Sequence, residues 1–154
     1  MPHPAVIYLS NDAVTSPKLG ALIDGLRAND QPLVFCVGLP ETTAPVSRIS
    51  AAQRRIDLLA IEQNAWVLAG RDARCVVVDT RTELDWAMKN GQISVWAPSK
   101  IVLDAVDGPS VGPSDTLGLA VWFAQQMHAA EIVTIGVTPP EVAEMPIRSI
   151  PLPE

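Results

Sequence analysis

The stretch Pro109–Gly136, PSVGPSDTLGLAVWFAQQMHAAEIVTIG, decides the fold because it predicts a loop, a helix and a strand in succession. Ser114 is the predicted N-cap, since its hydroxyl can accept a hydrogen bond from a free backbone N–H, and Asp115 follows where the helix dipole favours an anion. Nearly every residue of Leu117–Phe123 is apolar, which is typical of a helix covered on more than one side. Ile132–Ile135 then predicts a short buried strand. Such a helix start can hold a phosphate or can serve only as a cap.

Outward from this stretch, strands and helices alternate. Short apolar runs predict strands buried on both faces at Ala5–Leu9, Pro32–Val37, Cys75–Val78 and Ile93–Trp96. Helices are predicted after Ser16-Pro17, from Ser50 to Gly70 and from Thr80 to Lys89. For Ile101–Leu103, strand and short helix remain equal alternatives. This alternation predicts a three-layer α/β sandwich with a mainly parallel sheet.

The chain of 154 residues corresponds to one domain, 1–154, with a proline-rich tail from about residue 138. That tail allows at most an edge strand at Ile147–Ile150. In the Ser50–Gly70 helix, the expected buried stripe holds Ile56, Leu59, Ala60, Trp66 and Val67, and the expected wet side holds Arg54, Arg55, Asp57 and Glu62. The four tryptophans are expected to lie mostly in the core, with one available for an interface.

Composition limits the kinds of partner. Only 18% of the residues are charged and 48% are hydrophobic, which favours an apolar interface and a homo- or hetero-oligomer. A net charge of −6 without a basic cluster argues against nucleic acid. No apolar run is long enough to span a membrane and Met1–Pro4 does not resemble a signal peptide, so a cytoplasmic protein is expected. Cys36 and Cys75 lie in apolar runs and are expected to be reduced core residues.

Ligands of parallel sheets bind beyond the carboxyl ends of the strands. The predicted rim there holds Ser10–Asp12, Gly38–Glu41, Asp79-Thr80 and Pro113–Thr116. A small phosphorylated or acidic ligand would suit the backbone N–H groups of this rim. Lys100 could neutralise a phosphate or could be a solvated surface residue. Asp12 and Asp79 could hold Mg²⁺ or could make turns, and no cluster with metal-ligand spacing is present, so no metal site is predicted.

The motifs Trp96-Ala97-Pro98, Pro113–Leu117 (PSDTL) and Ala129–Val133 (AAEIV), in this order, resemble the amino-acid kinase superfamily, which includes aspartokinase, N-acetylglutamate kinase and uridylate kinase. The chain is most similar to the short aspartokinase-like kinases of furan and pterin C1-carrier cofactor synthesis. The resemblance covers most of the chain and implies that Ser114 and Asp115 contact substrate or metal-nucleotide.

The chain departs from this family where phosphate is handled. The family's first strand ends in a Lys-x-Gly-Gly-Ser loop, and the matching run here is Tyr8–Asp12, YLSND. Of the family's second glycine cluster, only Gly38 remains. Phosphoryl transfer depends on positioning and on neutralising negative charge, so these losses remove its main means of catalysis. The resulting expectation is a degenerate, non-catalytic binding or assembly subunit linked to C1-carrier metabolism, with Ser10, Asn11, Asp12 and Gly38 retained as binding residues.

Two alternatives stay open from the sequence. One is an active ATP-dependent phosphotransferase in furan or pterin cofactor synthesis, with Mg-ATP as cosubstrate and with Lys100 or Arg48 as the missing cation. The other is a nucleotide or phosphate sensor on a similar α/β scaffold, since a fold alone does not define a function.

Overall fold

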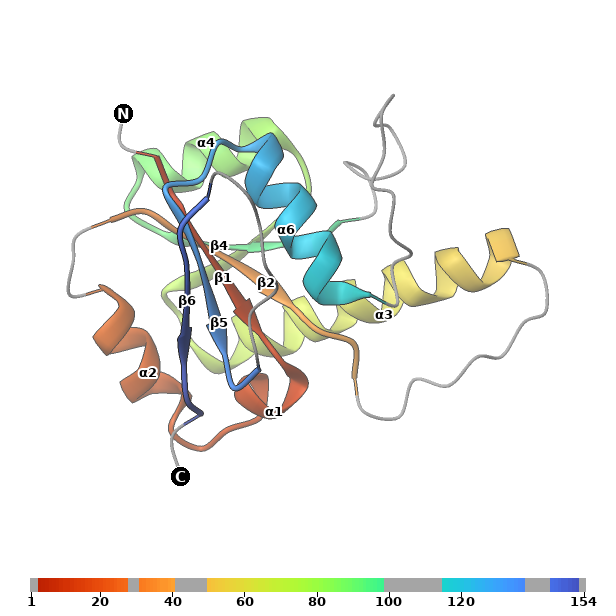
Figure 1. Ribbon diagram of the computed structural model, residues 1–154, viewed down its shortest axis with the longest axis horizontal. Helices are drawn as coiled ribbons and strands as arrows, with labels where there is room; N and C mark the ends of the chain where they lie inside the picture. The colour runs from red at the N-terminus through yellow and green to blue at the C-terminus, as the bar shows by residue number, and fades with distance from the viewer. Residues whose placement is uncertain (1–2, 28–30, 41–49, 99–114, 138–144, 153–154) are drawn as a thin grey trace.

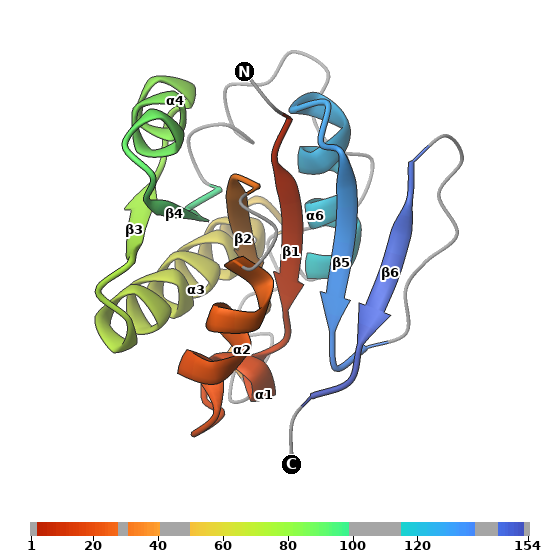
Figure 2. The ribbon, with the colours of Figure 1, turned by 90° about the vertical axis from the view of Figure 1, so that its left-hand side faces the viewer.

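The computed structural model describes residues 3–27, 31–40, 50–98, 115–137 and 145–152. Within them, a six-stranded, wholly parallel sheet has the order β3-β4-β2-β1-β5-β6 (Figures 1 and 2). The strands are β1 (Ala5–Leu9), β2 (Leu33–Val37), β3 (Cys75–Val78), β4 (Ile93–Trp96), β5 (Glu131–Ile135) and β6 (Ile147–Ile150). The helices are α1 (Asn11–Val14), α2 (Leu19–Leu26), α3 (Ser50–Arg71), α4 (Arg81–Lys89) and α6 (Thr116–Gln126). The predicted α/β fold is confirmed, and these strands lie within one residue of their predicted bounds.

Helices cover both faces of the sheet, which makes three layers. α3 packs on β2, β3 and β4 and contacts α1, whereas α4 packs on β3 and β4, and α6 packs on β1 and β5. Figure 2 shows α6 behind β1 and β5, on the face opposite to α2. The chain crosses the sheet from β1 through β2 to β3 and then returns through β4 to β5. Because parallel crossovers are right-handed, the helices of the return path, α4 and α6, lie on the second face.

Three helix starts differ from the sequence prediction. Ser10 begins a short helix, α1, instead of a loop, and its hydroxyl accepts a hydrogen bond from a first-turn N–H at 3.4 Å. The predicted cap Ser16 accepts from the N–H of Lys18 at 3.2 Å, so it closes a turn before α2, which begins without a side-chain cap. Asp115, not Ser114, is the N-cap of α6, and its carboxylate accepts from the third N–H beyond it at 2.9 Å. Ser114 lies outside the described residues.

The buried side of α3 is also different from the predicted one. Leu58, Ile61, Ala65 and Leu68 are buried, and so is Asp57, which was expected to be wet. Leu59, Trp66 and Val67, which were expected to be buried, are 51%, 65% and 43% exposed. Apolar residues occur all round this helix, so their periodicity does not define one stripe. Packing on β2, β3 and β4 determines which side of α3 is buried.

Only one of the four tryptophans is fully buried. Trp96 is buried, Trp122 is half-buried, and Trp66 and Trp86 are exposed, so the expectation of mostly buried tryptophans is wrong. None of the helices found within the described residues has the length and apolar character needed to cross a bilayer.

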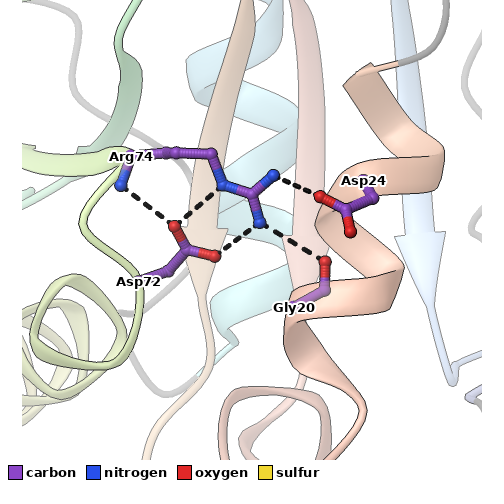
Figure 3. A network of polar contacts seen from close by, with 4 residues as sticks. All are labelled: Gly20, Asp24, Asp72 and Arg74. Atoms are coloured by element: carbon purple, nitrogen blue, oxygen red, sulfur yellow. Dashed lines mark hydrogen bonds and ion pairs between the residues drawn. The ribbon is translucent and has the colours of Figure 1, made fainter.

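A polar network holds α2 against the start of β3 (Figure 3). The guanidinium of Arg74 donates to Asp72 at 2.7 Å, to the Asp24 carboxylate and to the Gly20 carbonyl at 3.3 Å. The hydrogen bond from Arg74 lowers the pKa of Asp72 despite partial burial of the carboxylate. This network lies at the amino end of β3, and so at the opposite edge of the sheet from the predicted rim.

Ser94 offers a test of the packing beneath α4 and α6. It is fully buried on β4, and its hydroxyl has no hydrogen-bond partner among the described residues. Such a group costs about 1–3 kcal/mol, so we expect Ser94→Ala to raise the free energy of unfolding in urea by about 1 kcal/mol.

A matched control is Thr134→Val. Thr134 is equally buried on β5, but its hydroxyl donates to the Val137 carbonyl at 3.1 Å. This variant should lose stability by a similar amount. A loss of stability in Ser94→Ala as well would mean that the Ser94 hydroxyl has a partner.

Candidate ligand-binding site

The candidate site lies at the carboxyl ends of β1 and β2, beside the first turn of α6. The Tyr8 hydroxyl on β1 and the Thr116 hydroxyl on α6 are 2.7 Å apart and share a hydrogen bond. Gly38 follows β2 at the same place, and a Cβ built on it would lie 2.9 Å from the Tyr8 hydroxyl and 3.6 Å from Thr116 Oγ1. Since real Cβ atoms do not approach so closely, residue 38 must be glycine while Tyr8 occupies this position.

Asn64 joins α3 to this edge of the sheet. Its side-chain N–H donates to the Gly38 carbonyl at 2.8 Å and lies 3.4 Å from the Asn11 Oδ1. Asn64 is only 3% exposed, so its amide links α3, the end of β2 and the start of α1 in a dry environment. The sequence pattern alone does not single out Asn64 as a site residue. The only indication in the sequence is that Asn64 follows the apolar Ile61 by three residues, on the side of the helix that was expected to face solvent.

The electrostatics of the site are those of neutral and acidic groups. Burial raises the pKa of Tyr8 above its ordinary value of 10, the hydrogen bond with Thr116 partly opposes this, and the nearby Cys36 and Asp115 raise it further. Tyr8 is therefore a neutral phenol at physiological pH. In the described part of the chain, no lysine or arginine forms a hydrogen bond or ion pair with Tyr8, Asn64 or Thr116.

The predicted rim residues are brought together only in part. Asn11, Gly38 and Asp115 lie at the site, because the backbone N of Asn11 is 3.6 Å from the Gly38 Cβ position and Asp115 caps α6. Ser10 lies nearer the end of β5, with its hydroxyl 3.7 Å from a Cβ built on Gly136.

The remaining rim predictions fall away from this cluster or outside the described residues. Asp12 is exposed in the first turn of α1. Thr80 caps α4 beside the edge strand β3, where Asp79 precedes it. Lys100 and Ser114, as well as Arg48, are not among the described residues. No group of three or more His, Cys, Asp or Glu side chains suited to a metal ion occurs in the ranges that the structure describes.

Aromatic stacking fixes α6 on the sheet next to the site. The rings of Trp96 and Phe123 stack with centroids 4.0 Å apart, and the rings of Trp96 and Trp122 stack with centroids 6.4 Å apart. These contacts join the end of β4 to the middle of α6. They hold Thr116 at a fixed distance from Tyr8, because Thr116 begins the same helix.

Comparison of the sequence with models of known protein families finds no match, and comparison with curated proteins finds none either. The function must therefore be inferred from the chemistry of the chain itself. In that chemistry, the candidate site supplies hydroxyl, amide and carboxylate groups but no cation from its described side chains.

Tyr8 can be titrated directly, because it is the only tyrosine of the chain. We expect its phenolate absorbance to appear at a pH above 10 in the folded protein and near 10 in denaturant. A raised pKa in the folded state means that Tyr8 stabilises the fold fully below pH 10, and that this contribution is lost as the pH rises through the raised pKa. Tyr8→Phe should therefore lose stability less steeply above pH 10 than the wild type. A wild-type titration at the ordinary pKa would show that Tyr8 is not held in a buried contact.

The Asn64 link can be tested by Asn64→Leu, which has a similar volume but no amide. The variant leaves the buried Gly38 carbonyl without its donor, and we expect it to lower the free energy of unfolding by about 1–3 kcal/mol. Gln63→Leu is the control, since Gln63 is the exposed neighbour on the same helix and should change stability by less than about 0.5 kcal/mol. Equal effects of the two substitutions, measured by urea denaturation, would contradict the role of Asn64.

Proposed function

We propose that this chain is a degenerate amino-acid-kinase-like protein that serves as a non-catalytic assembly subunit. The proposal combines the resemblance of its motifs to that superfamily with the chemistry at the carboxyl edge of the sheet. The single observation that carries it is the Tyr8–Thr116 contact beside Gly38. When Tyr8–Asp12 is matched to the Lys-x-Gly-Gly-Ser loop of the resembled family, Tyr8 corresponds to the lysine that contacts the transferred phosphate.

The charge at this position is the decisive difference. A lysine ammonium neutralises the charge that develops on the phosphoryl group, whereas a buried phenol is neutral and here already shares its hydrogen bond with Thr116. For comparison, an arginine finger, which is one cation of a phosphoryl-transfer site, is worth about 10³–10⁵ in rate. The absence of the lysine alone would therefore lower the rate of phosphoryl transfer greatly.

The backbone cradle for phosphate is also reduced. Gly38 is the one glycine of its cluster, and its carbonyl is bound by Asn64, which fixes the orientation of this peptide group. At the start of α6, the Asp115 carboxylate already accepts from the Gly118 N–H, so an acidic side chain occupies the end of the helix that would favour an anion. These features favour assembly over binding of a phosphorylated ligand.

The resemblance to the short aspartokinase-like kinases suggests where such a subunit would act. We place it in C1-carrier cofactor metabolism, beside a catalytic partner that supplies the phosphoryl transfer which this chain lacks. The low content of charged residues, 18%, is consistent with a protein that buries part of its surface against another chain.

The test is to incubate the purified chain with Mg-ATP labelled in the γ-phosphate and to follow hydrolysis and transfer, with calorimetry at millimolar Mg-ATP for binding. We expect no turnover above the buffer control and no binding. Turnover that is lost in Asp115→Ala would overturn the proposal and favour the alternative of an active phosphotransferase. In that case Lys100→Ala and Arg48→Ala would identify which residue supplies the cation. Turnover that persists in Asp115→Ala would also overturn the proposal, unless it is equally strong in a mock purification from cells without this chain.

A further inference from the structure

We propose that a cavity at the amino edge of the sheet, between the end of α2 and the turn after α4, binds a small monocarboxylate with an apolar tail. The inference goes beyond the proposed function and does not rest on it, because Tyr8 lies at the opposite edge of the sheet. Its evidence is the arrangement of one arginine, two glutamine amides and several apolar side chains around one space.

The cavity lies where two adjacent strands begin. Leu33 is the first residue of β2 and Ile93 the first of β4, and the parallel register of these strands puts the two starts at one level. The cavity has a volume of about 210 Å³. Sites for drug-sized ligands measure about 300–1,000 Å³, so this cavity suits a smaller molecule.

The floor of the cavity is apolar. It is formed by Leu33 and Ile93, which are only 5% and 2% exposed, and by Met88 at the end of α4. Met88 is half-buried and packs against the hydrophobic core. These side chains offer no strong hydrogen-bonding atom. The floor therefore suits a hydrocarbon tail, whose removal from water is favourable.

The rim of the cavity carries polar side chains. Arg27 and Gln92 are exposed, and neither the guanidinium nor the Gln92 amide forms a hydrogen bond or ion pair with any residue that the structure describes. Gln31 also lines the cavity, and its amide donates to the His3 carbonyl at 3.3 Å, which leaves it a second N–H. The rim thus combines one positive charge with free N–H donors.

Nearby carboxylates do not occupy the Arg27 guanidinium. The hydrogen bond from Arg74 lowers the pKa of Asp72, and the charge of Arg27 lowers it further. Both oxygens of Asp72 are nevertheless bound by Arg74, at 2.9 and 2.7 Å, and Asp24 is bound by the same guanidinium (Figure 3). Arg27 is therefore available to an anion from solution.

The chemistry of the rim favours a carboxylate. A guanidinium fork matches the two oxygens of a carboxylate, and each amide N–H can add a charge-assisted hydrogen bond. α2 and α4 both end beside the cavity, and the negative ends of their dipoles disfavour an anion that no cation holds directly. Among the described residues that line the cavity, Arg27 alone is cationic. One such group balances a monocarboxylate better than a phosphate, which carries more charge at neutral pH.

A ligand in this cavity would reinforce an existing connection. The Ile93 N–H donates to the Arg74 carbonyl at 3.0 Å, and the Arg74 guanidinium binds the Gly20 carbonyl of α2 at 3.3 Å. A carboxylate held by Arg27, with its tail on Ile93, joins α2 to the start of β4 a second time. Binding should therefore raise the melting temperature of the protein.

The experiment titrates the isotope-labelled full chain with hexanoate at neutral pH and follows the side-chain amide signals of Gln31 and Gln92 by NMR. We expect saturable shifts at millimolar concentration, because a small ligand makes few contacts. Hexanamide, which has the same tail without the charge, should bind about tenfold more weakly, and inorganic phosphate should not saturate in the same range.

Three results of this titration would overturn the inference. They are the absence of saturable shifts with hexanoate, equal binding of hexanamide or phosphate, and shifts that occur at Gly38 and Thr116 but not at Gln31 and Gln92.

Substitution of Arg27 tests the role of its charge. Arg27→Gln should weaken hexanoate binding by about tenfold, because it removes the charge that holds the carboxylate. Arg55→Gln is the matched control, since Arg55 is an exposed arginine on α3 that does not line the cavity. Equal weakening in the two variants would mean that only the overall charge of the protein attracts the ligand, and would contradict the site.

A charge placed in the cavity gives a second test. Met88→Glu supplies a carboxylate that can pair with Arg27, so it should abolish hexanoate binding, whereas Met88→Gln, with a side chain of the same length and no charge, should still bind. Wild-type binding by a folded Met88→Glu variant overturns the inference. Because Arg27 is exposed, Arg27→Gln keeps the inference testable if Met88→Glu does not fold.

The two proposals fail separately. Mg-ATP turnover by a chain that binds hexanoate overturns the proposed lack of catalysis and leaves the carboxylate site standing. A chain that neither turns over Mg-ATP nor binds hexanoate overturns the carboxylate site and leaves the absence of phosphoryl transfer standing.

Discussion

The hydrogen bond between Tyr8 and Thr116 joins the first strand to the last described helix across 108 positions of the chain. It is made at the carboxyl edge of a sheet whose central strands, β1 and β2, are buried at every position. Because β1 is in register with β2 on one side and β5 on the other, the ends of all three strands lie at one level. The arrangement of groups at the candidate site depends on this register and on the stacking of Trp96 against α6.

α3 connects this site to the outer surface of the molecule. Its inner side carries Asn64, whose amide binds the end of β2, together with the apolar residues that cover the sheet. Its outer side carries Leu59 and Trp66, which are largely exposed. A helix that is apolar on both sides suits a position between a sheet and a second protein surface.

The strands and the layer arrangement could be predicted because continuous β-branched runs admit few alternatives in a chain that alternates with helices. The capping box at Thr80 was predictable because its partners are close in the sequence. Thr80 accepts from the N–H of Glu83 at 3.1 Å. The buried side of α3 was not predictable, because it depends on contacts with β2, β3 and β4 that are distant in sequence. Asn64 was not predictable for this reason either, because its partner Gly38 lies 26 residues away in the sequence.

The scaffold also explains why a phenol is tolerated where the resembled family has a cation. A lysine at this buried position would need a carboxylate or a bound phosphate to offset desolvation, whereas Tyr8 is neutral and finds its partner in Thr116. Active sites that hold like or uncompensated charges reduce stability, so replacing such a charge by a hydrogen-bonded neutral group stabilises the empty site. Burial of Tyr8 and its contact with Thr116 thus make the carboxyl edge of the sheet a stable, uncharged surface in the absence of a ligand.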